Sequence, residues 1–371
     1  MSDHTSNSPI IPDLAVYYFT GTGNSRRVAA WIAERAQAAG IGARTETIAG
    51  KRAADVSPGG PGTWVGFVTP THGFTLPWIM LRFLLRLPAG RGTQAFAAAT
   101  RAGMKIDPVF TPGVSGTLTW LASAILAFKG YRVRGVASFD MPSNWMAVHP
   151  GFGEIAARAI IARAEPRVEA FADTLFAGKR AWLSWWNAYE LFWALVLWPV
   201  SILYVIVGRF FLASINYAGP SCTGCGLCSR MCPTGAITMR GGEKKRPVWS
   251  FSCESCMRCL GMCPENAVQV SYLWAFGLWY GLVSLMAIPV FVRVSEVIAK
   301  KLAIPATVVT HLLWLVPYLI VLWMSHLLLV RISRMPVFRH IILFSSPTAV
   351  YRRYHEPDTR RADLIERERP E

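Results

Sequence analysis

The spacing of the cysteines constrains this chain more than any other feature. All eight lie between Cys222 and Cys263, in two runs that share the pattern C-x2-C-x2-C-x3-C-P. The runs are Cys222, Cys225, Cys228, Cys232 with Pro233, and Cys253, Cys256, Cys259, Cys263 with Pro264. Disulfides are typical of small secreted chains in oxidising compartments. Neither condition fits, because the chain has 371 residues and its polar start, Met1 to Asp13, predicts no signal peptide.

This spacing is typical of iron-sulfur clusters, in which three close thiolates bind one 4Fe-4S cube and the fourth reaches another cube. A four-thiolate zinc site normally uses two C-x2-C pairs instead. A radical enzyme would need C-x3-C-x2-C, which does not occur in the sequence. Two neighbouring cubes that each change by one electron, without breaking a bond, predict an electron relay.

The segment from Asn216 to Val270 resembles a bacterial two-cluster ferredoxin. The resemblance implies that Cys222, Cys225, Cys228 and Cys263 bind one cluster, and that Cys232, Cys253, Cys256 and Cys259 bind the other. We expect Ala236-Ile237 and Ala267-Val268 to be apolar covers that keep water away from the cubes.

Upstream, short apolar runs alternate with amphipathic helical patterns, which is typical of βαβ units around a parallel sheet. The predicted strands are Leu14–Phe19, Ala43–Ile48, Trp64–Val68, Gln94–Ala99 and Val133–Phe139. The predicted helices are Ser25–Ala39, Leu76–Leu87, Thr117–Phe128 and Glu154–Phe176. We expect Pro166 to kink or restart the last helix. The pattern predicts an α/β domain with five parallel strands.

The first predicted strand leads through Thr20-Gly21-Thr22-Gly23-Asn24-Ser25 directly into a helix. Hydroxyl groups and backbone N–H groups at a helix N-terminus bind phosphate without needing a cation. A dinucleotide fingerprint would need glycine in place of Arg26, and a Walker loop would need Gly-Lys-Ser or Gly-Lys-Thr. A bare glycine turn is the remaining alternative.

The loop resembles the phosphate loop of flavodoxins, and residues 14–178 fit their order of five strands and helices. The resemblance implies FMN bound by Thr20, Gly21, Thr22, Gly23, Asn24 and Ser25. It also implies two loops beside the flavin ring, namely Pro70, Thr71, His72, Gly73 and Phe74, and Thr100, Arg101, Ala102 and Gly103. The segment Met141-Pro142-Ser143-Asn144-Trp145 is similar to one in fused flavodoxin-ferredoxin proteins. The apolar segments of this chain are a difference from that family, whose proteins otherwise end at the ferredoxin.

Three apolar stretches flank the cysteines: Trp182 to Ile215, Val270 to Val292, and Ala303 to Val330. Each reaches the ~20 residues that span a bilayer. For the last two, a buried hairpin in a soluble core is the alternative. The first stretch is too short for two spans. It either forms a re-entrant or interfacial helix broken at Pro199, or crosses the membrane once and places the two cofactor domains on opposite faces. We expect the first arrangement, because cofactor domains on opposite faces could not exchange electrons directly.

The predicted organisation is a flexible N-terminus (1–13), a flavodoxin-like FMN domain (14–178), a membrane segment (182–215), a ferredoxin-like domain (216–270), a transmembrane helical hairpin (271–330) and a basic cytoplasmic tail (331–371) whose end, from Glu356, is mobile. The net charge of +16 suits nucleic acid, lipid or an acidic partner, and apolar segments make lipid the simplest choice. We expect no nucleic acid. The predicted location is the cytoplasmic (inner) membrane, multi-pass, with both cofactor domains facing the cytoplasm.

These features predict a membrane-anchored electron-transfer protein with FMN and two 4Fe-4S clusters. No NAD(P)H site is visible, so we expect a redox partner protein, a reductase or an electron donor. One alternative is an oxidoreductase that acts on a membrane quinone; another is a redox-sensing or scaffolding protein without flavin. His311 and His326, on one face of the last apolar stretch, suit a polar helix contact, a quinone site or haem shared with a dimer partner.

Overall fold

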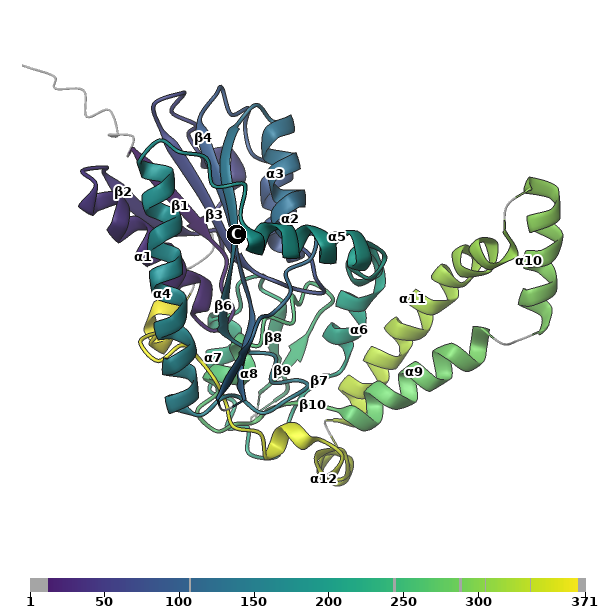
Figure 1. Ribbon diagram of the computed structural model, residues 1–371. Coiled ribbons are helices and arrows are strands. Elements are labelled where there is room, and N and C mark those ends of the chain that lie inside the picture. The colour runs from purple at the N-terminus through teal and green to yellow at the C-terminus, as the bar shows by residue number, and fades with distance from the viewer. Residues whose placement is uncertain are drawn as a thin grey trace, which may run out of the picture.

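The structure is a computed structural model that describes residues 13–106, 108–242, 245–286, 289–303, 305–333 and 335–365. Its N-terminal part is a parallel sheet with helices on both faces (Figure 1). The parallel strands are β1 (Leu14–Tyr18), β2 (Ala43–Thr47), β3 (Trp64–Pro70), β4 (Gln94–Ile106) and β6 (Arg132–Pro142). Their order, β2-β1-β3-β4-β6, is the flavodoxin-like one, in which the ligand site lies where the order reverses beside β1. The predicted α/β fold is confirmed.

The sheet has a separate apolar core on each face. Helices α1 (Asn24–Ala38) and α4 (Glu154–Phe176) cover one face, and α2 (Trp78–Leu85) and α3 (Leu118–Phe128) cover the other. Strand β4 serves both cores, since Phe96 and Ala98 point to α1 and α4 while Ala95, Ala97 and Ala99 point to α2 and α3. A strand buried on both faces is what a parallel sheet requires.

Two details of this domain differ from the prediction. Pro166 lies inside α4, so the helix does not restart there, and Ala164 and Val168 on either side of it stay packed in the core. Strand β4 continues past the predicted end at Ala99, and its last residues pair with an additional antiparallel strand, β5 (Val109–Thr111). A short 3-10 turn at Ala53–Asp55 follows β2.

The cysteine-rich part is a small domain with two antiparallel ribbons. Strand β7 (Asn216–Ala218) pairs with β10 (Val268–Val270), and β8 (Ile237–Arg240) pairs with β9 (Arg246–Trp249). The third cysteine of each group of three lies in a short helix: Cys228 in α7 (Leu227–Arg230) and Cys259 in α8 (Arg258–Met262). Buried Ile237, Trp249, Leu260 and Val268 form the core between them.

The apolar stretch between the two domains forms α5 (Trp185–Leu203), a π-helical turn (Tyr204–Gly208) and α6 (Arg209–Ser214). The predicted break at Pro199 is not found; the direction changes instead at the π-helical turn (Figure 1). One side of this helix packs on the sheet domain: Asn187 donates to the carbonyl of Val136 (3.1 Å), and Ser201 donates to that of Phe74 (3.0 Å).

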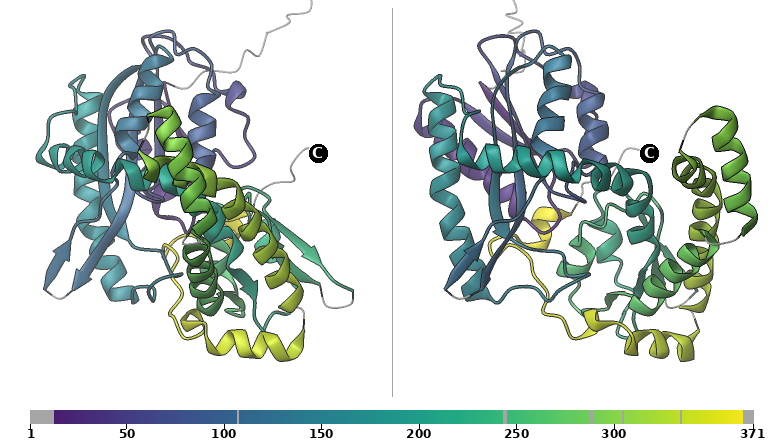
Figure 2. Two further views of the ribbon diagram at one scale, coloured as in Figure 1. Left: turned by 90° about the vertical axis from the view of Figure 1, so that its right-hand side faces the viewer. Right: turned by 45° about the vertical axis from the view of Figure 1, so that its right-hand side comes forward.

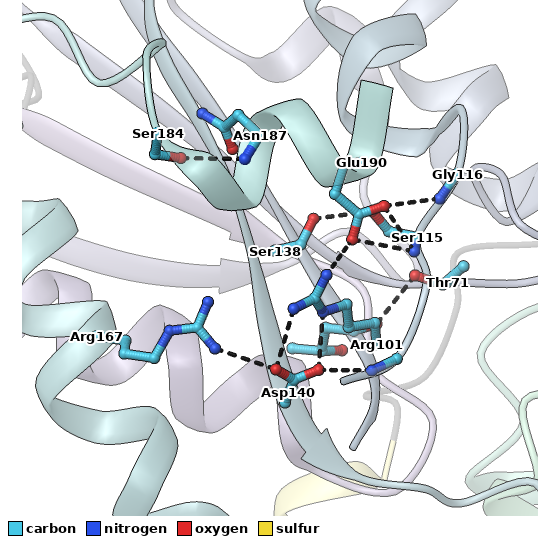
Figure 3. A network of polar contacts seen from close by, with 12 residues as sticks. Thr71, Arg101, Ser115, Gly116, Ser138, Asp140, Arg167, Ser184, Asn187 and Glu190 are labelled. Carbon is cyan, nitrogen blue, oxygen red and sulfur yellow. Dashed lines mark hydrogen bonds and ion pairs between the residues drawn. The ribbon is translucent and has the colours of Figure 1, made fainter. Parts of the chain in front are cut away.

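A buried ion-pair network fixes α5 to the sheet (Figure 3). The side chain of Arg101 has no exposed surface, and its guanidinium binds Asp140 through two hydrogen bonds and Glu190 of α5 through another. Glu190 also accepts hydrogen bonds from the backbone N–H groups of Ser115 (2.9 Å) and Gly116 (3.0 Å). Each buried charge therefore has a partner of opposite sign.

After the cysteine-rich domain, α9 (Tyr272–Met286), α10 (Pro289–Leu302) and α11 (Ala306–Ile332) form an arm that projects from the body (Figure 1). The predicted membrane segment Val270 to Val292 includes α9 and the start of the charged, amphipathic α10, and these two helices run in different directions (Figure 1). Within the described residues, two helices are long and apolar enough to cross a membrane, Trp185–Ser214 and Ala306–Ile332.

From Glu356 to Ile365 the C-terminal segment is not the mobile tail that the sequence predicts; residues 366–371 of that prediction lie outside the described residues. After α12 (Pro336–Phe344) and a 3-10 turn (Pro347–Ala349), the segment returns along the body to α1 and forms a second turn (Arg361–Leu364) (Figures 1 and 2). Glu356 is buried; its N–H donates to the carbonyl of Thr22 (2.8 Å), and its carboxylate pairs with Arg27. Charge composition predicted mobility, but these specific partners fix the segment.

Replacing Glu190 by Ala should lower the free energy of unfolding by about 3–5 kcal/mol, because Arg101 then loses one of its two buried anionic partners. Glu165→Ala, at an exposed position of α4, is the matched control and should stay within about 0.5 kcal/mol of the wild type. Denaturant unfolding, followed by the fluorescence of the tryptophans, measures both. Equal effects would mean that the network does not hold α5.

Candidate functional site

The eight cysteines surround two neighbouring cavities. Cys222, Cys225, Cys228 and Cys263 line one, with Cys259 also on its wall, and Cys232, Cys253, Cys256 and Cys259 line the other. In each set, three cysteines come from one run and the fourth comes from the end of the other run. The structure thus brings together the two ligand sets that the resemblance implies.

Backbone N–H groups point at several of the sulfur atoms. Ala236 donates to Cys232 (3.2 Å), Ala267 donates to Cys263 (3.3 Å), and Ser255 donates to Cys253 (3.4 Å). Hydrogen bonds of this kind tune the potential of a cluster bound through the same sulfurs. The expected apolar covers are buried, with Ile237 on the wall of the second cavity and Ala267 and Val268 on the wall of the first.

Two sets of four cysteines, with backbone N–H groups pointing at several of their sulfur atoms, fit two iron-sulfur clusters. Burial raises the pKa of the Cys256 thiol to about 11 and that of Cys228 to about 12. Bound iron would stabilise the thiolate forms against this effect of burial.

The loop from Thr20 to Ser25 forms the second candidate site. It ends at the N-terminus of α1, and Gly23 adopts a positive φ of 111° that favours glycine. The N–H of Gly23 donates to the hydroxyl of Thr20 (3.0 Å). Among the described residues, the N–H groups of Asn24 and Ser25 have no acceptor. Unpaired donors at a helix N-terminus are the groups that bind a phosphate.

A pocket opens beside this loop. Of the predicted site residues, Thr20, Gly21, Thr22, Asn24, Ser25, Pro70, Thr71, Thr100, Arg101 and Ala102 line it. The remaining wall is formed by Pro142, Ser143 and Asn144, which were not among the predicted site residues. The signal was present, since these residues belong to the segment noted after the last strand. The loop and pocket fit FMN.

Five predicted residues lie elsewhere. His72, Gly73 and Phe74 are not on the wall of the pocket, and neither is Gly103, which faces another hollow beside Asp140. Gly23 turns toward the C-terminal segment, where an added Cβ would meet Thr359. The guanidinium of Arg101 points to its carboxylate partners rather than into the pocket.

The helix after the domain explains where the His72 loop lies. Tyr204 packs on Gly73, and the carbonyl of Phe74 accepts hydrogen bonds from Ser201 and from the N–H of Thr117 (2.9 Å). Burial lowers the pKa of His72 to about 4, so the imidazole is neutral at physiological pH. The predicted ring loop is therefore covered by α5 and the π-helical turn.

The phosphate loop touches the second cysteine run directly. The carbonyl oxygen of Cys256 lies so close to Gly21 that an added Cβ would approach it to 2.1 Å. Arg258, which is 2 % exposed, donates to the carbonyls of Thr20 (2.8 Å) and Gly21 (3.2 Å). This contact places the loop of one cofactor site against a ligand of the other.

A second contact joins the same two domains. Glu254, the neighbour of Cys253, accepts a hydrogen bond from the N–H of Trp78 (3.0 Å) at the N-terminus of α2. A carboxylate is favoured at this end of a helix. Burial raises the pKa of Glu254 to about 7, against the effect of these N–H donors.

Comparison with known proteins gives one match to a family model. Residues 221–267 match the family model of a 4Fe-4S dicluster domain. No curated protein is similar enough to count as a match. Among solved structures, the chain is similar to a flavodoxin from the domain Archaea, with 12 % identity and a TM-score of 0.28. The aligned part covers 43 % of this chain and 98 % of the flavodoxin.

Two bacterial flavodoxins give similar values. The Streptococcus pneumoniae TIGR4 flavodoxin has 16 % identity and a TM-score of 0.31, with coverage of 44 % of this chain and 98 % of the flavodoxin. Flavodoxin 1 of Bacillus cereus has 14 % identity and a TM-score of 0.31, with coverage of 44 % and 97 %. This chain therefore joins a domain with the flavodoxin-like strand order to a segment that matches a 4Fe-4S dicluster domain.

Proposed function

We propose that this chain is a membrane-anchored electron-transfer protein that connects FMN with two 4Fe-4S clusters. The observation that carries the proposal is the direct contact between the phosphate loop and the second cysteine run, at Gly21 and Cys256. Because the two sites touch within one chain, electron exchange between them needs no domain movement.

In the site at the Thr20 to Ser25 loop, each group of residues would have its own role. The N–H groups at the start of α1 would bind the phosphate, and Thr71, Thr100 and Asn144 would line the space beside it. When bound, FMN supplies exchange of electrons singly or in pairs. Arg258 holds the loop against the cysteine run, and Tyr354 holds it from the other side through a hydrogen bond to Asn24 (2.7 Å).

The cysteines would hold the clusters in sequence. The set of Cys232, Cys253, Cys256 and Cys259 lies against the flavin domain, and the set of Cys222, Cys225, Cys228 and Cys263 lies farther out. None of the inner set is exposed, whereas Cys225 of the outer set is. This order makes the outer set the point of contact with a redox partner protein, either a reductase or an electron donor.

The anchor is proposed from the two long apolar helices. Both cofactor domains touch each other and the C-terminal segment, so all three belong on one face of the membrane, for which we propose the cytoplasmic face. The arm of α9 to α11 would then enter the lipid and return. The helix 185–214 is attached to the sheet domain along one side, so it would lie in the lipid interface with its exposed Phe192, Leu195 and Trp198 toward lipid.

FMN should bind to the purified protein roughly tenfold or more tightly than riboflavin. The phosphate alone distinguishes the two ligands, and one hydrogen bond from an N–H group to a charged oxygen contributes about 1.5–3 kcal/mol. Quenching of flavin fluorescence during titration of the flavin-free protein measures both affinities. Equal affinities would show that Thr20 to Ser25 do not bind a phosphate.

Gly21→Ala should slow electron exchange between the flavin and the clusters. The new methyl group would overlap the carbonyl of Cys256, which costs about 1–3 kcal/mol and moves the two loops apart. Gly62→Ala, where a Cβ meets no atom within 4 Å, is the control. Flash reduction followed by flavin absorbance and cluster paramagnetic resonance gives the rate. A Gly21 variant with the wild-type rate would refute this route.

One observation favours the alternative function, a quinone-linked oxidoreductase. His326 of α11 is 7 % exposed. Its ring lies beside that of Phe251, which precedes Cys253 by two residues, and the two ring centroids are 5.1 Å apart. Its Nδ1 has no hydrogen-bond partner in the described part of the chain. A buried imidazole between a membrane helix and a cysteine run suits the carbonyl of a quinone. The side chain of His311 lies outside the description.

If the quinone function holds, a menaquinone analogue should rapidly reoxidise the chemically reduced wild type in detergent. His326→Leu should lose this reaction, whereas His340→Leu, at an exposed position of α12, should keep it. Stopped-flow absorbance follows the reoxidation. A wild type that stays reduced in the presence of quinone would leave the carrier function as the better explanation.

A further inference from the structure

The outer cysteine set opens to solvent beside the β8–β9 hairpin. Cys225 is exposed, and Met239 of β8 and Pro247, in β9, line the same cavity. The backbone of Lys245 packs on Gly224, next to Cys225, where an added Cβ would lie 2.7 Å from the Lys245 carbonyl oxygen. The hairpin therefore borders the exposed edge of this site.

This edge carries a concentration of positive charge. Arg230 donates to the carbonyl of Cys225 itself (3.3 Å), and Arg246 donates to that of Gly219 (2.8 Å). The side chains of Arg230, Arg240 and Lys245 are exposed. Within the described ranges none of these residues pairs with a carboxylate. We call Arg230, Arg240, Lys245 and Arg246 the basic rim.

The charges of the basic rim do not serve the stability of the hairpin. Arg240 and Arg246 are direct partners across the two strands, and like charges in this position destabilise a hairpin. Ion pairs occur in many other places on this protein, including Arg35 with Asp173 and Arg44 with Glu46. A basic cluster that pairs with no carboxylate of the described residues, at the exposed end of a redox relay, therefore points to an external anionic partner.

The placement of the rim favours a protein over the lipid surface. The β8–β9 hairpin projects from the body in a different direction from the arm of α9 to α11, as the two views of Figure 2 show. An arm inserted in lipid would thus leave the rim open to the aqueous phase. The exposed Cys225 at its centre also suits a partner that must approach the cluster ligands closely.

We propose that the basic rim docks an acidic electron-carrier protein against the outer cysteine set. The proposal rests on the proposed function and names the chemistry of its partner. One electron passes between the outer cluster and the carrier, so one is oxidised as the other is reduced, and no bond or proton changes. Complementary charge raises the rate of encounter by about 10–10³-fold and makes it sensitive to salt.

The test uses a small acidic two-cluster ferredoxin and the same ferredoxin with its carboxylates amidated. Calorimetry at low and at high salt gives the Kd for each with the full-length protein in detergent. The acidic form should bind at low salt and weaken markedly near 0.15 M salt, where the Debye length is about 8 Å. The amidated form should bind roughly tenfold more weakly or not at all.

The variant for this test is the double charge reversal Arg240→Glu with Lys245→Glu, which touches neither a cysteine nor a recorded side-chain contact. It should weaken binding roughly tenfold or more, and slow the electron exchange by a similar factor. Lys179→Glu with Arg180→Glu makes the same change in net charge at exposed positions of the flavin domain and should bind like the wild type.

The electron exchange is measured after chemical reduction of the clusters, so it does not depend on bound flavin. Failure of FMN to bind would therefore count against the proposed function without affecting this test. Equal binding by the wild type and the Arg240, Lys245 variant would overturn the docking proposal. The proposal would also be overturned if the wild type bound vesicles of anionic lipid through Arg240 and Lys245 but did not bind the acidic ferredoxin.

Discussion

The contact between the Thr20 to Ser25 loop and the second cysteine run is the constraint on which the rest of the structure depends. Arg258 is buried at this point, and its guanidinium donates to carbonyls of three separate segments, at Thr20, Met231 and Leu364. A buried cation without such acceptors would cost several kcal/mol. The hydrogen bonds of one side chain thus require the flavin domain, the cysteine-rich domain and the C-terminal segment to fold together.

The local predictions succeeded where chemistry is encoded by spacing. Two runs of cysteines imply two ligand sets that exchange their fourth member, and the structure brings those sets together. The positions of the strands and helices follow from alternating apolar patterns, because each element must bury its own apolar face. Each strand, helix and cysteine run is encoded by neighbouring residues, whereas the exchange of the fourth cysteine and the order of the strands in the sheet came from the resemblance to known families.

The predictions failed where distant segments decide the outcome. Nothing near His72 shows that Tyr204 will cover the adjacent glycine, or that Arg101 will be drawn toward Glu190, 89 residues later. The C-terminal segment appeared mobile because its composition is charged, yet Glu356 finds Arg27 and the carbonyl of Thr22. Pairwise contacts of this kind depend on the assembled fold, and a single sequence carries no local signal for them.

The helix from Trp185 to Ser214 shows why apolar length alone does not determine topology. Its composition suits a membrane span, but crossing the membrane would pull Glu190 away from Arg101 and from the N–H groups of Ser115 and Gly116. Breaking a buried pair costs about 3–5 kcal/mol, and carrying the carboxylate into lipid would add to that cost. The helix is therefore packed on the sheet domain as one unit with it, and in the proposed membrane-anchored arrangement its exposed apolar side would face lipid without separating the flavin domain from the clusters.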